Sequence, residues 1–118
     1  MMLLPSTNMK VFLRLGVTDM RKSINGLSIL VEDFLEQNPF SGHLFVFCNR
    51  KKDILKILYW ERNGFCLWQK RLEKHRFTWP SDGTDTQLIT QKELMWLLDG
   101  LDFSQVHPHE SLTYLSAS

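Results

Sequence analysis

The sequence predicts an α+β domain: an antiparallel β-meander of four to five strands, with one long helix packed on one face and a short C-terminal helix. Three features support this: an alternating apolar segment near the start, an amphipathic segment after it, and a series of strand-like segments from residue 43 to residue 80. The chain has 118 residues, of which 43% are hydrophobic and 23% charged, which suits one globular domain. We expect residues 1–102 to form that domain and residues 103–118 to form a mobile tail.

The first strand and the long helix follow one another near the start of the chain. Residues 10–15 place apolar side chains at every second position, as a strand does. Thr18 or Asp19 supplies an oxygen that can cap the helix, which we expect to continue to about Glu36. Pro39 ends it, because the residue before a proline disfavours helical angles. The apolar face of the helix contains Ile24, Leu27, Leu30, Val31, Phe34 and Leu35.

The middle of the chain alternates strand-like segments with turn residues. The expected strands are 43–48, 54–60, 65–72 and 77–79. Asn63-Gly64 is a strong two-residue hairpin signal, because both residues tolerate positive φ. Residues 81–87 are expected to form a loop. Thr90 and Glu93 have the spacing of a capping box, so a short helix begins there, and it ends at Asp99-Gly100.

The hairpin register sorts these side chains onto two faces. If Asn63-Gly64 are the central turn residues, Lys56 lies opposite Arg71 on a mixed face. That mixed face contains Lys56, Leu58, Trp60, Arg62, Phe65, Leu67, Gln69 and Arg71. The other face is expected to be the core face and contains Phe45, Phe47, Leu55, Ile57, Tyr59, Cys66, Trp68, Leu72, Phe77 and Trp79. We therefore expect the long helix to cover Ile57, Tyr59 and Trp68.

Charge is distributed unevenly along the chain. Residues 50–76 carry nine basic and three acidic side chains, whereas residues 77–118 carry one basic and six acidic side chains. Basic residues interleaved with aromatics are typical of a sheet that binds a nucleic-acid backbone, and the alternative is a solvated charged face. The candidate nucleic-acid-binding residues are Arg50, Lys51, Lys52, Lys56, Arg62 and Arg71, together with Arg21 and Lys22 near the expected start of the long helix.

The mixed face also suggests a protein interface. Leu58, Trp60 and Leu67 would form one apolar patch in water, which favours a homodimer or a partner protein, unless the acidic short helix covers it. A protein–protein adaptor or dimerisation module without direct DNA contact is therefore the alternative to DNA binding.

No pattern predicts catalysis, a cofactor or a metal site. The aspartates fall in expected turns or caps, and no nucleophile motif or phosphate-binding glycine loop is present. His107 and His109 alone make a weak metal site. Cys48 and Cys66 are expected to be reduced and to lie on opposite faces of the sheet. No segment resembles a signal peptide or a membrane span, so we expect a non-enzymatic cytoplasmic protein.

Several segments resemble one known protein family. Residues 16–27 read GVTDMRKSINGL, and the likeness continues through 39–47, 55–60, 64–68 and 70–73. Together they resemble the TnpB-type accessory protein, the second-frame product of the bacterial insertion-sequence family numbered sixty-six. The resemblance covers roughly residues 10–102 and implies a non-catalytic role in transposition, beside a separate transposase encoded by the element. It implies contact with DNA near the element ends, with the transposase, or with both, although Cys48-Asn49 replaces a more basic turn.

Overall fold

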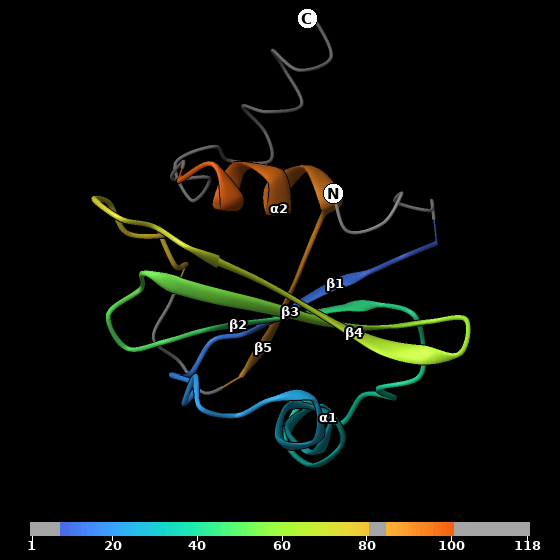
Figure 1. Ribbon diagram of the computed structural model, residues 1–118. Helices are drawn as coiled ribbons and strands as arrows, with labels where there is room; N and C mark the ends of the chain where they lie inside the picture. Colours follow the sequence, from blue (N-terminus) through green and yellow to red (C-terminus); the bar gives the residue numbers. More distant parts are fainter. Residues whose placement is uncertain (1–7, 81–84, 101–118) are drawn as a thin grey trace, which may run out of the picture.

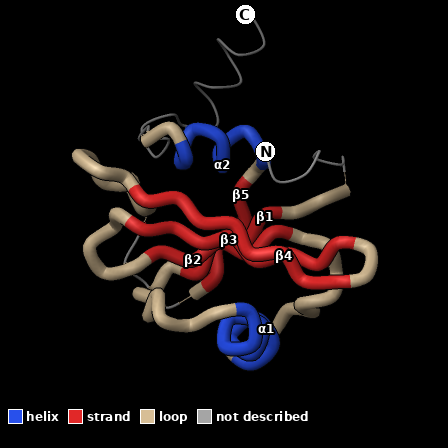
Figure 2. Tube along the Cα trace, in the orientation of Figure 1, coloured by secondary structure: helices blue, strands red, loops and turns tan. Residues whose placement is uncertain are grey.

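The computed structural model describes residues 8–80 and 85–100, which form a five-stranded sheet with one helix on each face (Figure 1, Figure 2). The α+β class is therefore confirmed. The elements in chain order are β1 (Val11–Arg14), α1 (Ile24–Asp33), β2 (Leu44–Cys48), β3 (Ile54–Glu61), β4 (Gly64–Arg71), β5 (Thr86–Ile89) and α2 (Gln91–Leu98). None of the helices in these residues is long and apolar enough to cross a membrane.

The sheet is mixed, so the expected antiparallel meander is wrong in part. The strand order is β4-β3-β2-β1-β5, and β1 runs parallel to β2 while the other neighbours are antiparallel. The parallel pair arises because α1 carries the chain back across the sheet before β2 begins. Residues 77–79 are not a strand. The edge strand beside β1 is β5, whose first two residues fall within the expected loop 81–87.

Helix α1 is shorter than the sequence indicated. Asp19 does not cap it: its carboxylate accepts the Arg21 N–H at 2.9 Å and forms a separate turn before the helix. The first helical residue follows Ser23, and the last is Asp33. Beyond it, Glu36 adopts a φ of 54°, in the left-handed region that interrupts a helix.

The β3–β4 hairpin has a register that differs by two residues from the expected one. Glu61 pairs with Gly64, so Arg62 and Asn63 are the turn residues, and Lys56 lies opposite Gln69 instead of Arg71. Arg62 adopts a φ of 55°, and the Asn63 N–H donates to the Glu61 carbonyl at 2.6 Å. Since side chains alternate with a period of two, each hairpin residue nevertheless stays on its predicted face.

The long helix lies on the face opposite to the one we expected. Helix α1 packs on the mixed face, where Leu58 is fully buried, and not on Ile57, Tyr59 and Trp68. The buried cluster beneath it consists of Phe12, Leu27, Leu30, Val31, Leu35, Phe45, Phe47 and Leu58. Phe45 and Phe47 lie here because the β2–β3 register pairs them with Leu58 and Lys56.

Helix α2 covers the other face, where Leu94, Leu97 and Leu98 pack against the sheet. The predicted capping box is confirmed: Thr90 Oγ1 accepts the Glu93 N–H at 3.0 Å, and the Glu93 carboxylate accepts the Thr90 N–H at 2.8 Å. At the other end of the helix, Lys70 Nζ donates to the Leu98 carbonyl at 2.8 Å.

Cys48 and Cys66 lie on the same face of the sheet, so the expectation of opposite faces is wrong. Both belong to the side covered by α2. Cys48 pairs with Leu55 and Cys66 pairs with Tyr59, and these two residues of β3 share that face. Both are free thiols, and burial raises the pKa of Cys48 to about 12. The proposed tail and its two histidines, His107 and His109, lie outside the described residues.

Candidate nucleic-acid interface

Three segments that are far apart in the sequence meet at one end of the sheet, on the left in Figure 1. The Thr18 N–H donates to the Cys48 carbonyl at 2.9 Å, which joins the loop before α1 to the end of β2. The Leu72 N–H donates to the backbone carbonyl of Asp53 at 2.8 Å, and the Phe77 N–H donates to the backbone carbonyl of Lys52 at 2.7 Å. These bonds join the segment after β4 to the β2–β3 turn. We call this meeting point the basic end.

The basic end carries more positive than negative charge. Its basic residues are Arg21, Lys22, Arg50, Lys51, Lys52, Arg71, Lys74 and Arg76, and all except the partly buried Lys52 are exposed. Its acidic residues are Asp19, Asp53 and Glu73. Asp19 pairs with Arg21 at 2.7 Å and Glu73 pairs with Arg71 at 3.0 Å. The excess of cations therefore gives this end a positive field that attracts anions.

An open groove of about 450 Å³ lies between these three segments. Arg50 and Lys51 line it from the β2–β3 turn, Arg71 lines it from the end of β4, and Asp19 lines it from the loop before α1. The structure thus brings together three of the predicted nucleic-acid-binding residues, although Arg71 is twenty residues away from the turn in the sequence.

Asn49 shapes the turn that presents Arg50 and Lys51. Its side-chain oxygen accepts the N–H groups of Asp53 and Ile54, both at 3.1 Å, and its amide nitrogen donates to the Asp53 carboxylate at 2.7 Å. From the sequence, residues 49–53 are interpreted as a polar turn, and Cys48-Asn49 as a departure from a more basic turn in the family. The polar turn was the signal for the role of Asn49, because asparagine commonly bonds backbone groups a few residues ahead.

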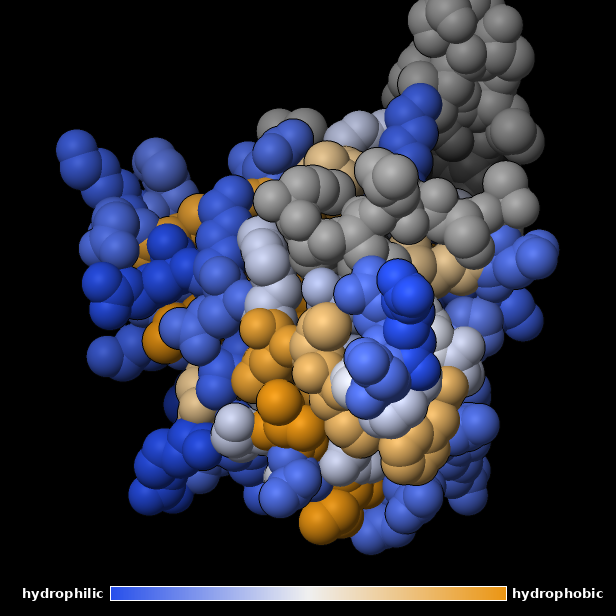
Figure 3. Space-filling view, turned by 45° about the vertical axis from the view of Figure 1, so that its right-hand side comes forward, coloured by the Kyte–Doolittle hydropathy of each residue, from blue (hydrophilic) through white to orange (hydrophobic). Residues whose placement is uncertain are grey.

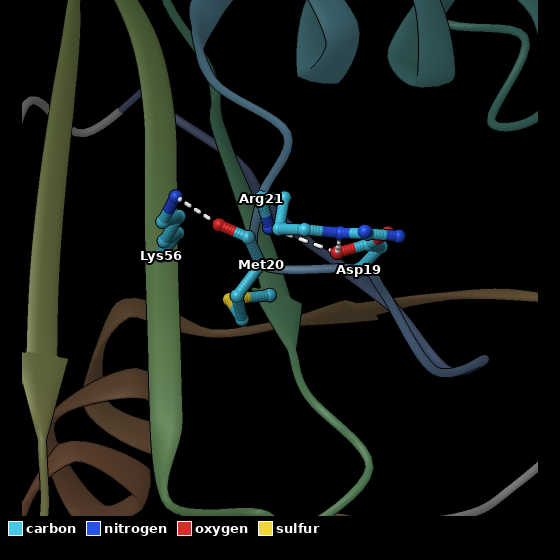
Figure 4. Close-up of polar contacts among 4 residues, drawn as sticks. All are labelled: Asp19, Met20, Arg21 and Lys56. Atoms are coloured by element: carbon cyan, nitrogen blue, oxygen red, sulfur yellow. Dashed lines mark hydrogen bonds and ion pairs between the residues drawn. The ribbon is translucent and has the colours of Figure 1, made fainter.

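Lys56 lies beneath the basic end and not on its surface (Figure 4). The residue is 8% exposed, and its Nζ donates to the carbonyl oxygens of Met20 at 2.8 Å and Lys22 at 2.9 Å. These bonds attach the loop before α1 to β3. Lys56 therefore positions the backbone that carries Arg21 and Lys22, although the sequence had placed it among the groups that contact DNA.

Arg21 and Asp19 form a close ion pair within that loop (Figure 4). The guanidinium donates from Nε and Nη2 to the carboxylate at 3.0 and 2.7 Å. These bonds lower the pKa of Asp19 to about 2, so the carboxylate is charged at neutral pH. Arg21 can bind a phosphate only by sharing or exchanging this partner.

Arg62 and the predicted apolar patch lie elsewhere. Arg62 is in the turn at the opposite end of the β3–β4 hairpin, about 25 Å from the basic end at roughly 3.3 Å per residue. The predicted patch is largely covered, because Leu58 is buried under α1 and Trp60 and Leu67 are only partly exposed.

An aromatic cluster remains at the hairpin end. Trp60 packs against Phe40 and Phe65 with ring centroids 5.0 Å from each, and Phe40 is 54% exposed. The space-filling view turned toward this end shows apolar atoms bordered by hydrophilic ones (Figure 3). The two ends of the sheet therefore differ in chemistry: one is cationic and the other is aromatic.

Comparison with known proteins identifies the chain. The model of the family described as IS66 Orf2 like protein matches residues 9–108. The chain belongs to the IS66 Orf2-like family. This confirms the resemblance to the TnpB-type accessory protein of that insertion-sequence family.

Relatives of this IS66 Orf2-like protein occur in Sinorhizobium fredii. The uncharacterised protein y4hO is 39% identical over 110 residues, which cover 92% of this chain and 94% of y4hO. The uncharacterised protein y4jC is 31% identical over 102 residues, covering 86% of this chain and 87% of y4jC. No solved structure matches significantly.

The IS66 Orf2-like family match spans the whole basic end and associates the chain with insertion sequences as an accessory protein. The groups gathered there are guanidinium and ammonium donors, which suit the binding of anions more than proton transfer at neutral pH. In residues 8–80 and 85–100, no group of three histidine, cysteine, aspartate or glutamate side chains is arranged to hold a metal ion.

Proposed function

We propose that this IS66 Orf2-like protein assists transposition without catalysing it, by binding DNA near the element ends through the basic end and working beside the element's transposase. The observation that supports this most is the gathering of cationic side chains from three separate segments at one end of the sheet, where Arg50, Lys51 and Arg71 line an open groove. Each Lys or Arg that neutralises a phosphate releases counterions, which favours binding to a polyanion.

The arrangement favours contact with the DNA backbone over reading of bases. The cations at the basic end lie on turns and loops, except Arg71 at the end of β4, and none belongs to α1 or α2. Exposed residues of α1 include Glu32 and Asp33, which would be repelled by phosphate in a groove. Binding should therefore depend strongly on salt and weakly on DNA sequence.

Charge reversal at the basic end tests this proposal. The variant R50E/K51E reverses two exposed charges that line the groove, and K10E/K92E reverses two exposed charges away from it with the same change in net charge. We expect R50E/K51E to abolish most of the binding to labelled element-end DNA at low salt. The slope of log affinity against log salt should fall by roughly one unit for each phosphate that the variant no longer neutralises.

Two outcomes would contradict the basic end as the interface. The first is an equal decrease of affinity in R50E/K51E and K10E/K92E, which would indicate a net-charge effect. The second is absence of binding by the wild type even at low salt. A separate R62E variant tests the sequence-based prediction for Arg62: a decrease of affinity there would move the interface toward the hairpin end.

A protein–protein adaptor is the second candidate, and the half-exposed aromatic cluster favours it. Phe40, Trp60 and Phe65 offer a cluster of rings at the hairpin end of the sheet, away from the basic end. Under this alternative, immobilised protein captures the transposase without DNA, F40S abolishes the capture, and R50E/K51E retains it. Under the DNA-binding proposal, capture requires element-end DNA, and R50E/K51E abolishes it.

A further inference from the structure

Strand β4 forms a long free edge of the sheet. Among residues 8–80 and 85–100 it is the outermost strand and pairs only with β3; it contains eight residues, whereas β5 at the other edge contains four. The edge runs across the front of the view in Figure 1. An unpaired edge of this length presents a row of backbone donors and acceptors to which another strand can add.

The register shows which backbone groups of β4 point outward. Residues of an antiparallel strand alternate between turning both N–H and C=O toward the neighbour and turning both away. Leu72, just beyond the strand, donates its N–H to Asp53 in the same register as the hairpin, so even-numbered residues face β3. The odd-numbered residues therefore turn their N–H and C=O outward: these are Phe65, Leu67, Gln69 and Arg71.

Two devices that commonly protect a sheet edge, proline and a bulge, are missing from β4, and its charges lie at its last two positions. The strand contains no proline, and its register with β3 continues without a bulge from Gly64 to Arg71. Lys70 does not guard the edge, because its Nζ is bonded to the Leu98 carbonyl on the α2 side. Within the described part of the chain, no backbone hydrogen bond occupies the outward groups of the odd-numbered residues.

We propose that two copies of this chain associate by antiparallel pairing of their β4 edges, which joins their sheets across a two-fold axis at Trp68. In this register Phe65 pairs with Arg71 of the second copy, and Leu67 pairs with Gln69 of the second copy. Every outward N–H and C=O group of the strand then has a partner. The odd-numbered side chains of both copies remain on the α1 side, as the period of the strand requires.

The side chains of β4 favour its own copy as the occupant. Both cations of the strand, Lys70 and Arg71, are at its last two positions, and its first half is uncharged. Antiparallel self-pairing therefore opposes no like charges. It places the Arg71 guanidinium beside the Phe65 ring of the second copy and brings the two Trp68 side chains together across the axis.

The alternating pattern of amide protection provides the test, independently of any DNA binding. Molar mass is measured by sedimentation equilibrium on the full chain at low and high concentration, and amide hydrogen exchange is followed in the same samples. We expect a dimer at high concentration, with the Leu67 and Gln69 amides becoming protected only there. The Trp68 and Lys70 amides, which face β3, should be protected at both concentrations.

Gln69 offers a matched pair of variants. Q69P removes an outward N–H that β3 does not use, so the monomer fold should tolerate it, whereas Q69A changes the side chain but keeps the N–H. We expect Q69P to raise the dimer dissociation constant by about tenfold or more and Q69A to leave it nearly unchanged. A wild type that is monomeric at all concentrations, or a dimer in which the Leu67 and Gln69 amides still exchange freely, would overturn the proposal. If Q69P fails to fold, the wild-type exchange pattern alone decides.

Discussion

The two faces of the sheet are covered in different ways. On one face the ten-residue α1 lies over phenylalanines such as Phe12 and Phe45, whose rings stack with centroids 5.5 Å apart. On the other face the eight-residue α2 covers a larger cluster and is assisted by loop residues such as Phe77 and Trp79. The longer helix therefore does not indicate the larger core, because short helices with good caps and loop support can complete one.

The largest loss of stability should come from a substitution beneath α1. Phe45 is fully buried, so F45A should lower the free energy of unfolding by about 3–5 kcal/mol, because it removes buried apolar surface and leaves a cavity. Ile29, on the same helix-covered side but 54% exposed, provides the control, and I29A should cost less than about 0.5 kcal/mol. Urea denaturation measures both. Comparable destabilisation of the two variants would mean that α1 does not pack as described.

The polar attachment of the loop before α1 should have the next largest effect. K56M leaves the Met20 and Lys22 carbonyls without their donor, which should cost about 1–3 kcal/mol. Amide exchange should accelerate at Arg21 and Lys22, whose N–H groups bond Asp19 within that loop. K92M on α2 is the matched control and should leave those amides unchanged. Unaltered exchange in K56M would show that the loop does not depend on Lys56.

The capping box tests how far α2 relies on polar anchors. T90A removes the oxygen that accepts the Glu93 N–H and should cost about 1 kcal/mol, whereas T90N keeps an acceptor and should cost much less. Thermal unfolding of the two variants against the wild type provides the measurement. If T90A and T90N unfold together, packing alone holds α2 on its face.

The smallest expected effect is the pH dependence of stability that arises from the Asp19–Arg21 ion pair at the basic end. Because Arg21 lowers the pKa of Asp19 to about 2, the ion pair contributes stability above the ordinary carboxyl pKa of about 3.9, and this stability disappears as pH falls through about 2. An NMR titration should place the Asp19 midpoint near 2 in the wild type. In R21A the midpoint should return toward the ordinary value, and a midpoint that does not move would assign the shift to another group.

Local patterns predicted the elements better than they predicted the arrangement. Strands β1 to β4 and helix α2 were found close to their observed places, and the two-residue error in the hairpin register left every side chain of that hairpin on its correct face. The prediction of which sheet face α1 covers was wrong, because the register between β2 and β3 decides which side chains of β3 share a face with Phe45 and Phe47. That register is set by the Asn49 turn, in which Lys52 adopts a φ of 61° that no periodicity reveals.

The candidate site was predictable to a similar extent. Charge along the chain indicated Arg50, Lys51 and Arg71, and the structure gathers them at one groove. The burial of Lys56 was not predictable, because its partner carbonyls belong to residues 34 and 36 positions away in the sequence. Arg62 lies away from the basic end, because a hairpin places its turn at the opposite end of its two strands.

The position of β1 in the sheet has a consequence for synthesis of the protein. β1 lies between β2 and β5, so the first of the five described strands to be translated completes its hydrogen bonds only with the last of the five. Helix α2, which covers Ile57 and Tyr59, follows β5. Until then the nascent chain exposes an apolar sheet face that other chains or chaperones can bind. β5 and α2 therefore shield apolar surface that the earlier elements leave exposed, and the described fold is complete only after both have been translated.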